Sequence, residues 1–246
     1  MAIEKIEWVL VQGGVEEETI RTHYKQLLRR QHDFLKGYIS FFSYLHSPRD
    51  DEEQEASLER YRSLKEECEY HIGQHEGYYK KYPDDILSVL HSNLARALFK
   101  IDYISKNEYQ NQAACELHFD KAISFKPDNW YAHNWYATFL KEARKDFEGA
   151  RNHYDIAVRG DRNNPVFPHN LALLHYEWPT FSRQRLETAQ RDVRESQALC
   201  QKDQQWGNFI SYPEELLAKI NLLLGRSDLR DGEPLDADEL LPVDTN

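Results

Sequence analysis

The stretch FEGARNHYDIAV, residues 147–158, decides the fold because it places two rings and two alanines on one face of a helix. Phe147, Ala150, Tyr154 and Ala157 follow one another at steps of three, four and three residues. This is the spacing of a single helical stripe. A neighbouring helix can approach closely at the alanines and pack against the rings, so the stretch predicts a helix that packs on another helix.

The same stripe occurs in two further segments. One is CELHFDKAISF, residues 115–125, and the other is AQRDVRESQAL, residues 189–199. Each of the three segments follows a segment that carries a small residue of its own. The small or apolar residues of the pattern are Ala95, Cys115, Phe119, Ala122, Ala137, Ala172, Ala189, Val193 and Ser196. The chain therefore repeats a pair of packed helices about three times.

The repeat has the length of a helix-turn-helix solenoid unit. Ala137 and Ala172 are separated by 35 residues, and periods of this size are typical of such solenoids. Residues 83–204 resemble the tetratricopeptide repeat, and Pro127 in AISFKPDN sits where that family has its inter-repeat proline. Arg162 stands where the next proline belongs, and the loops inside the first and third units are longer than in the family pattern. The resemblance implies an all-α solenoid of about three divergent repeats.

The rest of the chain divides around these repeats. Residues 1–82 predict an N-terminal helical hairpin, made of a long amphipathic helix and a second helix from about residue 53 to residue 79. YPEELLAKINLLLG, residues 212–225, predicts a capping helix that completes a repeat domain over residues 83–226. Residues 227–246 are acidic, contain prolines and lack periodicity, so we expect a disordered tail.

Composition favours a helical protein of a reducing compartment. The 246 residues include only ten glycines and nine prolines, which fall mainly between the periodic segments. Three cysteines at wide spacing do not form a disulfide framework. The N-terminal segment lacks the order of a signal peptide, and the sequence has no apolar run of 18 residues. We therefore expect a cytoplasmic protein that makes no membrane contact.

The net charge of −11 is concentrated at the ends of the chain. Residues 91–210 are nearly neutral and carry no basic stripe, and phosphate-backbone binding needs clustered lysine and arginine. We do not expect direct binding to nucleic acid. The one strongly basic segment, RTHYKQLLRR at residues 21–30, is interpreted as a solvated helix face.

Signatures of catalysis are missing from the sequence. There is no glycine-rich phosphate loop, no HExxH and no GxSxG, and no pair of carboxylates stands out as a general acid and base. We predict no enzyme activity, no catalytic residues and no cofactor. The one alternative is a metal-dependent enzyme or sensor that uses Cys68, His71 and His75, which share a helix face and are zinc-competent donors.

The resemblance also implies a binding surface, because the first helices of tetratricopeptide repeats line a concave groove. We align Ala95, Ala137 and Ala172 with the small residue in the first helix of the family repeat and count the groove positions of the family from them. The resulting candidate set contains rings, amides and cations. Trp135 is not among these positions, and we assign it to the core. The candidate groove residues are Arg96, Phe99, Tyr131, Asn134, Thr138, Lys141, His169, Leu173 and Tyr176, with Val89, Ser92 and Val166 at the remaining positions.

The leading hypothesis is a non-catalytic adaptor, scaffold or chaperone-like protein. Its groove would hold the backbone of a partner segment at Asn134 and the apolar side chains of that segment at Phe99, Tyr131 and Tyr176. The partner is thus a protein or peptide. A second alternative is a half-a-tetratricopeptide scaffold subunit of an RNA-processing complex. Homo-oligomerisation stays open.

Overall fold

The computed structural model describes residues 54–77, 82–106 and 110–235. Within these ranges the chain is all-helical, and the only strand-like feature is an isolated bridge between Thr180 and Pro234. The elements are α3 (Gln54–Gly77), α4 (Asp84–Ile104), α5 (Gln112–Phe125), α6 (Trp130–Phe139), the π-helical turn η1 (Leu140–Arg144), α7 (Phe147–Gly160), α8 (Val166–Tyr176), α9 (Arg183–Lys202), the 3-10 turn η2 (Gln204–Trp206) and α10 (Ser211–Gly225).

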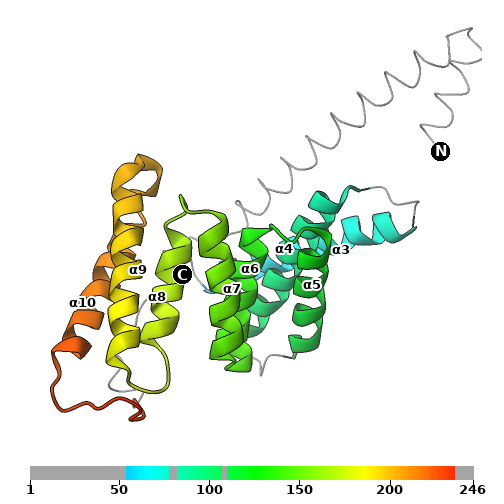
Figure 1. Cartoon of the computed structure of the whole chain (residues 1–246). Coiled ribbons are helices and arrows are strands. Elements are labelled where there is room, and N and C mark those ends of the chain that lie inside the picture. The colour runs from blue at the N-terminus through cyan, green and yellow to red at the C-terminus, as the bar shows by residue number, and fades with distance from the viewer. Residues whose placement is uncertain (1–53, 78–81, 107–109, 236–246) are drawn as a thin grey trace, which may run out of the picture.

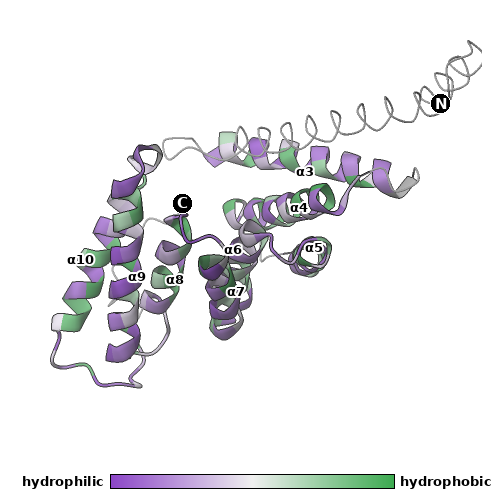
Figure 2. Ribbon diagram, turned by 45° about the horizontal axis from the view of Figure 1, so that its top comes forward, coloured by the Kyte–Doolittle hydropathy of each residue, from purple (hydrophilic) through white to green (hydrophobic). Residues whose placement is uncertain are grey.

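The helices form a row that follows chain order (Figure 1). Three pairs of consecutive helices, α4–α5, α6–α7 and α8–α9, pack as hairpins, and the first helices contact one another from α4 to α6 to α8. Figure 2 shows α3 alongside α4 at one end of the row and α10 beside α9 at the other end. The second helix of the expected N-terminal hairpin is therefore present as α3. Its first helix lies outside the described residues.

The core lies where the small residues of the repeated stripe meet. Ala95, Ala137 and Ala172 are fully buried, one in the first helix of each hairpin. The predicted stripes of α5, α7 and α9 are buried as well, except that Phe147 is only partly buried. Because an alanine side chain ends at Cβ, the helices approach closely at these points and the neighbouring rings fill the remaining space.

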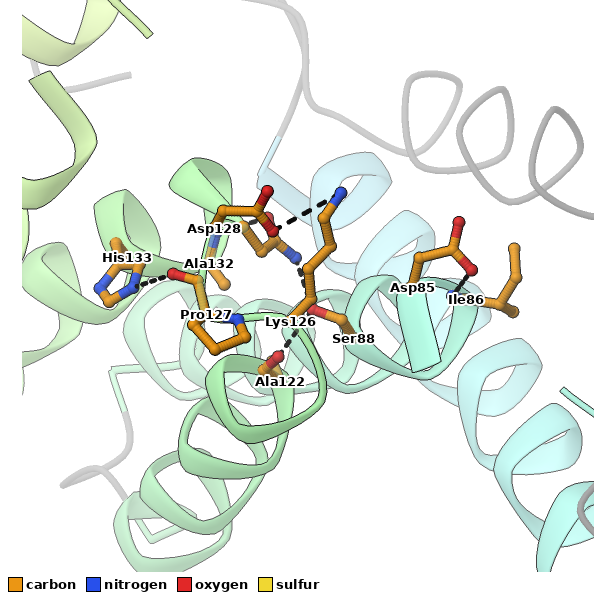
Figure 3. A network of polar contacts seen from close by, with 10 residues as sticks. Asp85, Ile86, Ser88, Ala122, Lys126, Pro127, Asp128, Ala132 and His133 are labelled. Carbon is orange, nitrogen blue, oxygen red and sulfur yellow. Dashed lines mark hydrogen bonds and ion pairs between the residues drawn. The ribbon is translucent and has the colours of Figure 1, made fainter. Parts of the chain in front are cut away.

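A polar network fixes the turn between the first two hairpins (Figure 3). Ser88 Oγ donates to the carbonyl oxygen of Ala122 over 2.7 Å and accepts from Asn129 Nδ2 over 2.9 Å. Asn129 also caps α6, because its Oδ1 accepts from the backbone N–H of Ala132. His133 Nε2 donates to the carbonyl oxygen of Pro127 over 3.1 Å. The start of α4 is thus tied to the end of α5 and to the start of α6.

The beginning of the acidic C-terminal segment pairs with the loop before α9. Phe181 N donates to Glu233 O over 2.7 Å, and Gly232 N donates to Phe181 O over 2.9 Å. Gly232 has a φ of 89°, which favours glycine. The structure differs here from the expected disorder, because backbone groups of residues 179–181, which belong to no helix, find partners in residues 232–235. Residues 236–246 lie outside the described residues.

None of the helices in the described ranges combines the length and the apolar run that crossing a membrane requires.

Candidate functional site

The first helices of the hairpins surround a cavity of about 320 Å³, which we call the groove. Side chains from α4, α6, η1 and α8 form most of its wall, and the segment from η2 to the start of α10 closes one end. The groove is lined by Arg96, Phe99, Lys100, Tyr103, Tyr131, Asn134, Trp135, Thr138, Lys141, Glu142, Tyr154, Asn164, Val166, Phe167, His169, Asn170, Leu173, Trp206, Phe209 and Tyr212.

Eight of the nine candidate groove residues line this one cavity, and Val166 lines it too. Tyr176, Val89 and Ser92 do not. Tyr176 is 1% exposed and belongs to a second core cluster formed by α8, α9 and α10. It lies on the core side of α8, so a ligand in the groove does not meet its ring.

One end of the groove is cationic. The guanidinium of Arg96 lies 5.3 Å from the ring centroid of Trp135, and Lys100 Nζ lies 5.6 Å from the same centroid. Burial, followed by the charge of Arg96, lowers the pKa of Lys100 to about 8. In the part of the chain that the structure describes, no carboxylate lies within 4 Å of Lys100 Nζ. This end therefore favours an acidic or hydrogen-bond-accepting group.

Trp135 serves both the core and the groove. Its ring is partly buried and packs against the core, as the sequence predicted, but it also forms the surface on which Arg96 and Lys100 rest. Cations above an indole ring are stabilised by the negative face of the ring.

Lys141 is buried in the groove wall with two carboxylates. Its Nζ lies 2.5 Å from Glu177 Oε2 and 2.9 Å from Glu142 Oε1. Burial alone would lower the pKa of Lys141, but Glu177, Tyr154 and Glu142 outweigh burial and raise it. Lys141 therefore holds η1 to the end of α8, and its charge is already compensated before any ligand arrives.

Amide groups occupy the middle of the groove. Asn170 Nδ2 donates to Asn134 Oδ1 over 3.0 Å. Thr138 Oγ1 donates to the backbone oxygen of Asn134 and lies 2.8 Å from the hydroxyl of Tyr154. Within the described ranges Asn134 Nδ2 donates to no protein group, which leaves it available to a carbonyl oxygen of a ligand.

The other end of the groove is aromatic. Tyr131 is 57% exposed and accepts a hydrogen bond from Asn164 Nδ2 over 3.2 Å. His169 contacts the ring of Phe209 edge to face, with 5.3 Å between centroids. Burial, followed by Lys141, lowers the pKa of His169 to about 4, so its ring is neutral at pH 7. Its buried Nδ1 has no hydrogen-bond partner in the described part of the chain.

Sequence reasoning missed several groove residues. Lys100 and Tyr103 follow Arg96 at helical spacing, so the face of α4 extended by one more turn would have included them. Trp206, Phe209 and Tyr212 follow the last repeat and belong to no repeat position. No periodic signal could have placed them at the groove.

The alternative metal site does not assemble in this structure. Cys68 is 1% exposed, and burial raises the pKa of its thiol to about 12. His71 makes hydrogen bonds to the hydroxyl of Tyr82 and to Glu67, and His75 Nδ1 accepts from the backbone N–H of Tyr82. Among the described residues no group of three or more ligating side chains could hold a metal ion. His71 and His75 join α3 to Tyr82 in the segment that precedes α4, and Cys68 belongs to the hydrophobic core.

No protein-family model matches this chain, and no curated protein matches it. The function is therefore argued from the site.

Proposed function

We propose that this chain is a non-catalytic protein–protein interaction module. Its three hairpins form a tetratricopeptide-like solenoid, and its groove binds a peptide segment of a partner protein. The observation that carries the proposal is the position of eight residues that the family resemblance assigns to the groove, which lie around one cavity between the first helices. The three cysteines are free and buried, which agrees with the cytoplasmic location predicted from the sequence.

The groove favours a segment with three features. An acidic or polar residue fits the cationic end at Arg96 and Lys100. The backbone carbonyl groups of the segment fit the free amide of Asn134. An apolar or aromatic side chain fits the rings of Tyr131 and Phe209, which line the same cavity, since aromatic anchors dominate the binding energy of many interfaces.

The test compares partner capture by the wild type with capture by two single variants. Tyr131→Ala removes an exposed ring from the groove. Tyr70→Ala removes a ring of similar exposure, 60% against 57%, from α3, where it does not line the groove. Lys141 is left intact because its removal would leave two partly buried carboxylates without their cation.

Each chain is used to capture proteins from a native lysate, and the affinity of each purified prey is then measured by titration. We expect Tyr131→Ala to weaken binding about tenfold or more and Tyr70→Ala to leave it unchanged. Equal affinity of the wild type and Tyr131→Ala for every prey would contradict the proposal. Circular dichroism checks that both variants keep the helicity of the wild type.

A further inference from the structure

A second cavity, of about 560 Å³, lies between α7 and α9, and we call it the outer cleft. The buried residues Leu171 and His175 of α8 contribute to its lining. Three arginines also line it, Arg151 from α7 and Arg185 and Arg191 from α9. None of these residues lines the groove, so the outer cleft is a separate site.

The guanidinium of Arg185 is the least compensated of the three. It lies 4.3 Å from the ring centroid of Trp178 and donates to the carbonyl oxygen of Thr180 over 3.0 Å. No carboxylate of the described residues lies within 4 Å of it. Arg151, by contrast, lies 2.7 Å from a carboxylate oxygen of Glu148.

The three arginines line the outer cleft together with His175. Burial lowers the pKa of His175 to about 4, and the charges of Arg185, Arg151 and Arg191 contribute in the same direction. The imidazole is therefore neutral at pH 7 and faces a positive field. A neutral ring in such a field is suited to donate a hydrogen bond to an anion that the guanidiniums attract.

Two buried polar atoms of the outer cleft have no hydrogen-bond partner among the described residues: Nδ1 of His175 and Oδ2 of Asp192. Both residues are only 9% exposed. The nearest cation to Asp192 is Arg191, whose Nε lies 3.7 Å from Oδ1, on the other carboxylate oxygen. Buried polar groups are nearly always paired in folded proteins, so two unpaired atoms in one cleft point to a ligand that completes them.

We propose that the outer cleft binds a phosphate group, either inorganic phosphate or a phosphate monoester. Arg185 and Arg151 donate to its oxygens. His175 donates from Nδ1 in the tautomer that carries its proton on this nitrogen. Asp192 Oδ2 accepts from a protonated phosphate oxygen. A phosphate whose second pKa is about 6 carries that proton part of the time near neutral pH, whereas sulfate has no proton to donate. The cleft also has room for the group to which the phosphate is attached.

The first test uses the unaltered chain and isothermal titration calorimetry at pH 6.5 with inorganic phosphate, O-phospho-L-serine and sulfate. We expect both phosphates to bind and sulfate to bind at least tenfold more weakly. Tighter binding of phosphoserine than of phosphate identifies a monoester as the ligand, and equal binding identifies the free ion. Equal affinity for phosphate and sulfate, or no heat with any of the three, would overturn the proposal.

The second test uses variants of α7 and α9. Arg185→Gln and Arg151→Gln each remove a guanidinium and are expected to weaken phosphate binding about tenfold or more. Arg194→Gln alters an exposed arginine of α9 outside the cleft and is expected to have no effect. Asp192→Asn is expected to raise the affinity for sulfate until it approaches that for phosphate. Undiminished phosphate binding by Arg151→Gln and Arg185→Gln would overturn the assignment.

Discussion

In the α4–α5 and α6–α7 hairpins, two histidines face each other across the pair of helices. Nδ1 of His91 lies 2.8 Å from Nδ1 of His118, and the same distance separates Nδ1 of His133 from Nδ1 of His153. One ring must donate and the other accept. Because His133 Nε2 donates to a carbonyl oxygen, its Nδ1 is the acceptor. Each pair is therefore a closed polar contact that depends on a neutral ring.

The α8–α9 hairpin differs at the equivalent positions. Pro168 precedes Ala172 by four residues, as His91 precedes Ala95, and Asp192 stands directly before Val193, as His118 stands before Phe119. Proline offers no side-chain hydrogen bond, and within residues 54–77, 82–106 and 110–235 Asp192 Oδ2 has no hydrogen-bond partner. Equivalent helix positions therefore form a histidine pair in two hairpins and do not form one in the third, where the outer cleft lies.

The largest effect is expected where the two kinds of hairpin are joined. Lys141 of η1 contacts Glu177 at the end of α8, and Lys141→Met leaves Glu142 and Glu177 without their cation. We expect a loss of about 3–5 kcal/mol in the free energy of unfolding, measured in urea. The control is Lys65→Met, which breaks a more exposed pair with Glu69 over 3.0 Å and is expected to cost about 1 kcal/mol or less. Equal losses would mean that the hairpins are not held together by Lys141.

Acid is expected to weaken the two hairpins that contain histidine pairs. Burial, followed by the neighbouring His118, Lys121 and His75, lowers the pKa of His91 to about 3. Burial and His133 lower the pKa of His153 to about 4, although Asp146 acts against this shift. The unfolded chain binds protons near pH 6.5, before these rings do in the folded chain, so stability falls as the pH drops from 6.5 towards 4. The loss is roughly 1.4 kcal/mol per pH unit for each histidine.

Unfolding in urea at pH 7, 6 and 5 measures this dependence. His153→Gln removes one titrating group, so its stability should decline less steeply than that of the wild type. Parallel curves for the two chains would show that the His133–His153 pair does not titrate in this range.

Asp192 is expected to respond to pH with the opposite sign. Burial raises the pKa of its carboxyl to about 6, and Glu195 and Asp155 act in the same direction while Arg191 opposes it. The folded chain holds this proton more tightly than the unfolded chain, so the contribution is present at low pH and is lost as the pH rises through 6. We expect Asp192→Asn to be about 2 kcal/mol more stable than the wild type at pH 7 in phosphate-free buffer. The difference should shrink by pH 4.

The smallest effects are expected at two glycines. A Cβ at Gly160 would lie 2.2 Å from the ring of Trp130, whereas a Cβ at Gly73 in α3 would meet nothing within 4 Å. Gly160→Ala should therefore cost about 1 kcal/mol or more through overpacking in the α6–α7 hairpin. Gly73→Ala should stabilise the chain by about 0.5–1 kcal/mol through helix propensity. Thermal denaturation compares the two, and shifts of the same sign would contradict the packing at Trp130.

Much of the architecture could be predicted because alanine is informative at a helix crossing. Ala137 in α6 and Tyr154 and Ala157 in α7 indicate both the helical period and the buried faces. The groove positions are expected from the resemblance to the tetratricopeptide repeat. Tyr176 was misplaced because the register of α8 turns its ring towards α9 and α10, which adds a contact that the repeat pattern does not contain.

Other features depend on the third dimension and leave no periodic signal. The charge of Lys141 is compensated by Glu177, 36 residues away. Asp192 faces no histidine across its hairpin because the equivalent position in α8 is Pro168. Phe209 reaches the groove only because η2 and the following turn return the chain towards α8. Local spacing carries no information on such contacts.

The pairing of residues 179–183 with residues 231–235 also decides how the chain bears mechanical load. Arg183 contributes to this closure, because its guanidinium donates to the carbonyl oxygens of Leu224 and Arg226 and its backbone N–H donates to Asp231. Tension applied beyond Leu235 meets these contacts before it reaches α10. The last helix is thus enclosed in a loop of chain and is shielded from force until the closure breaks.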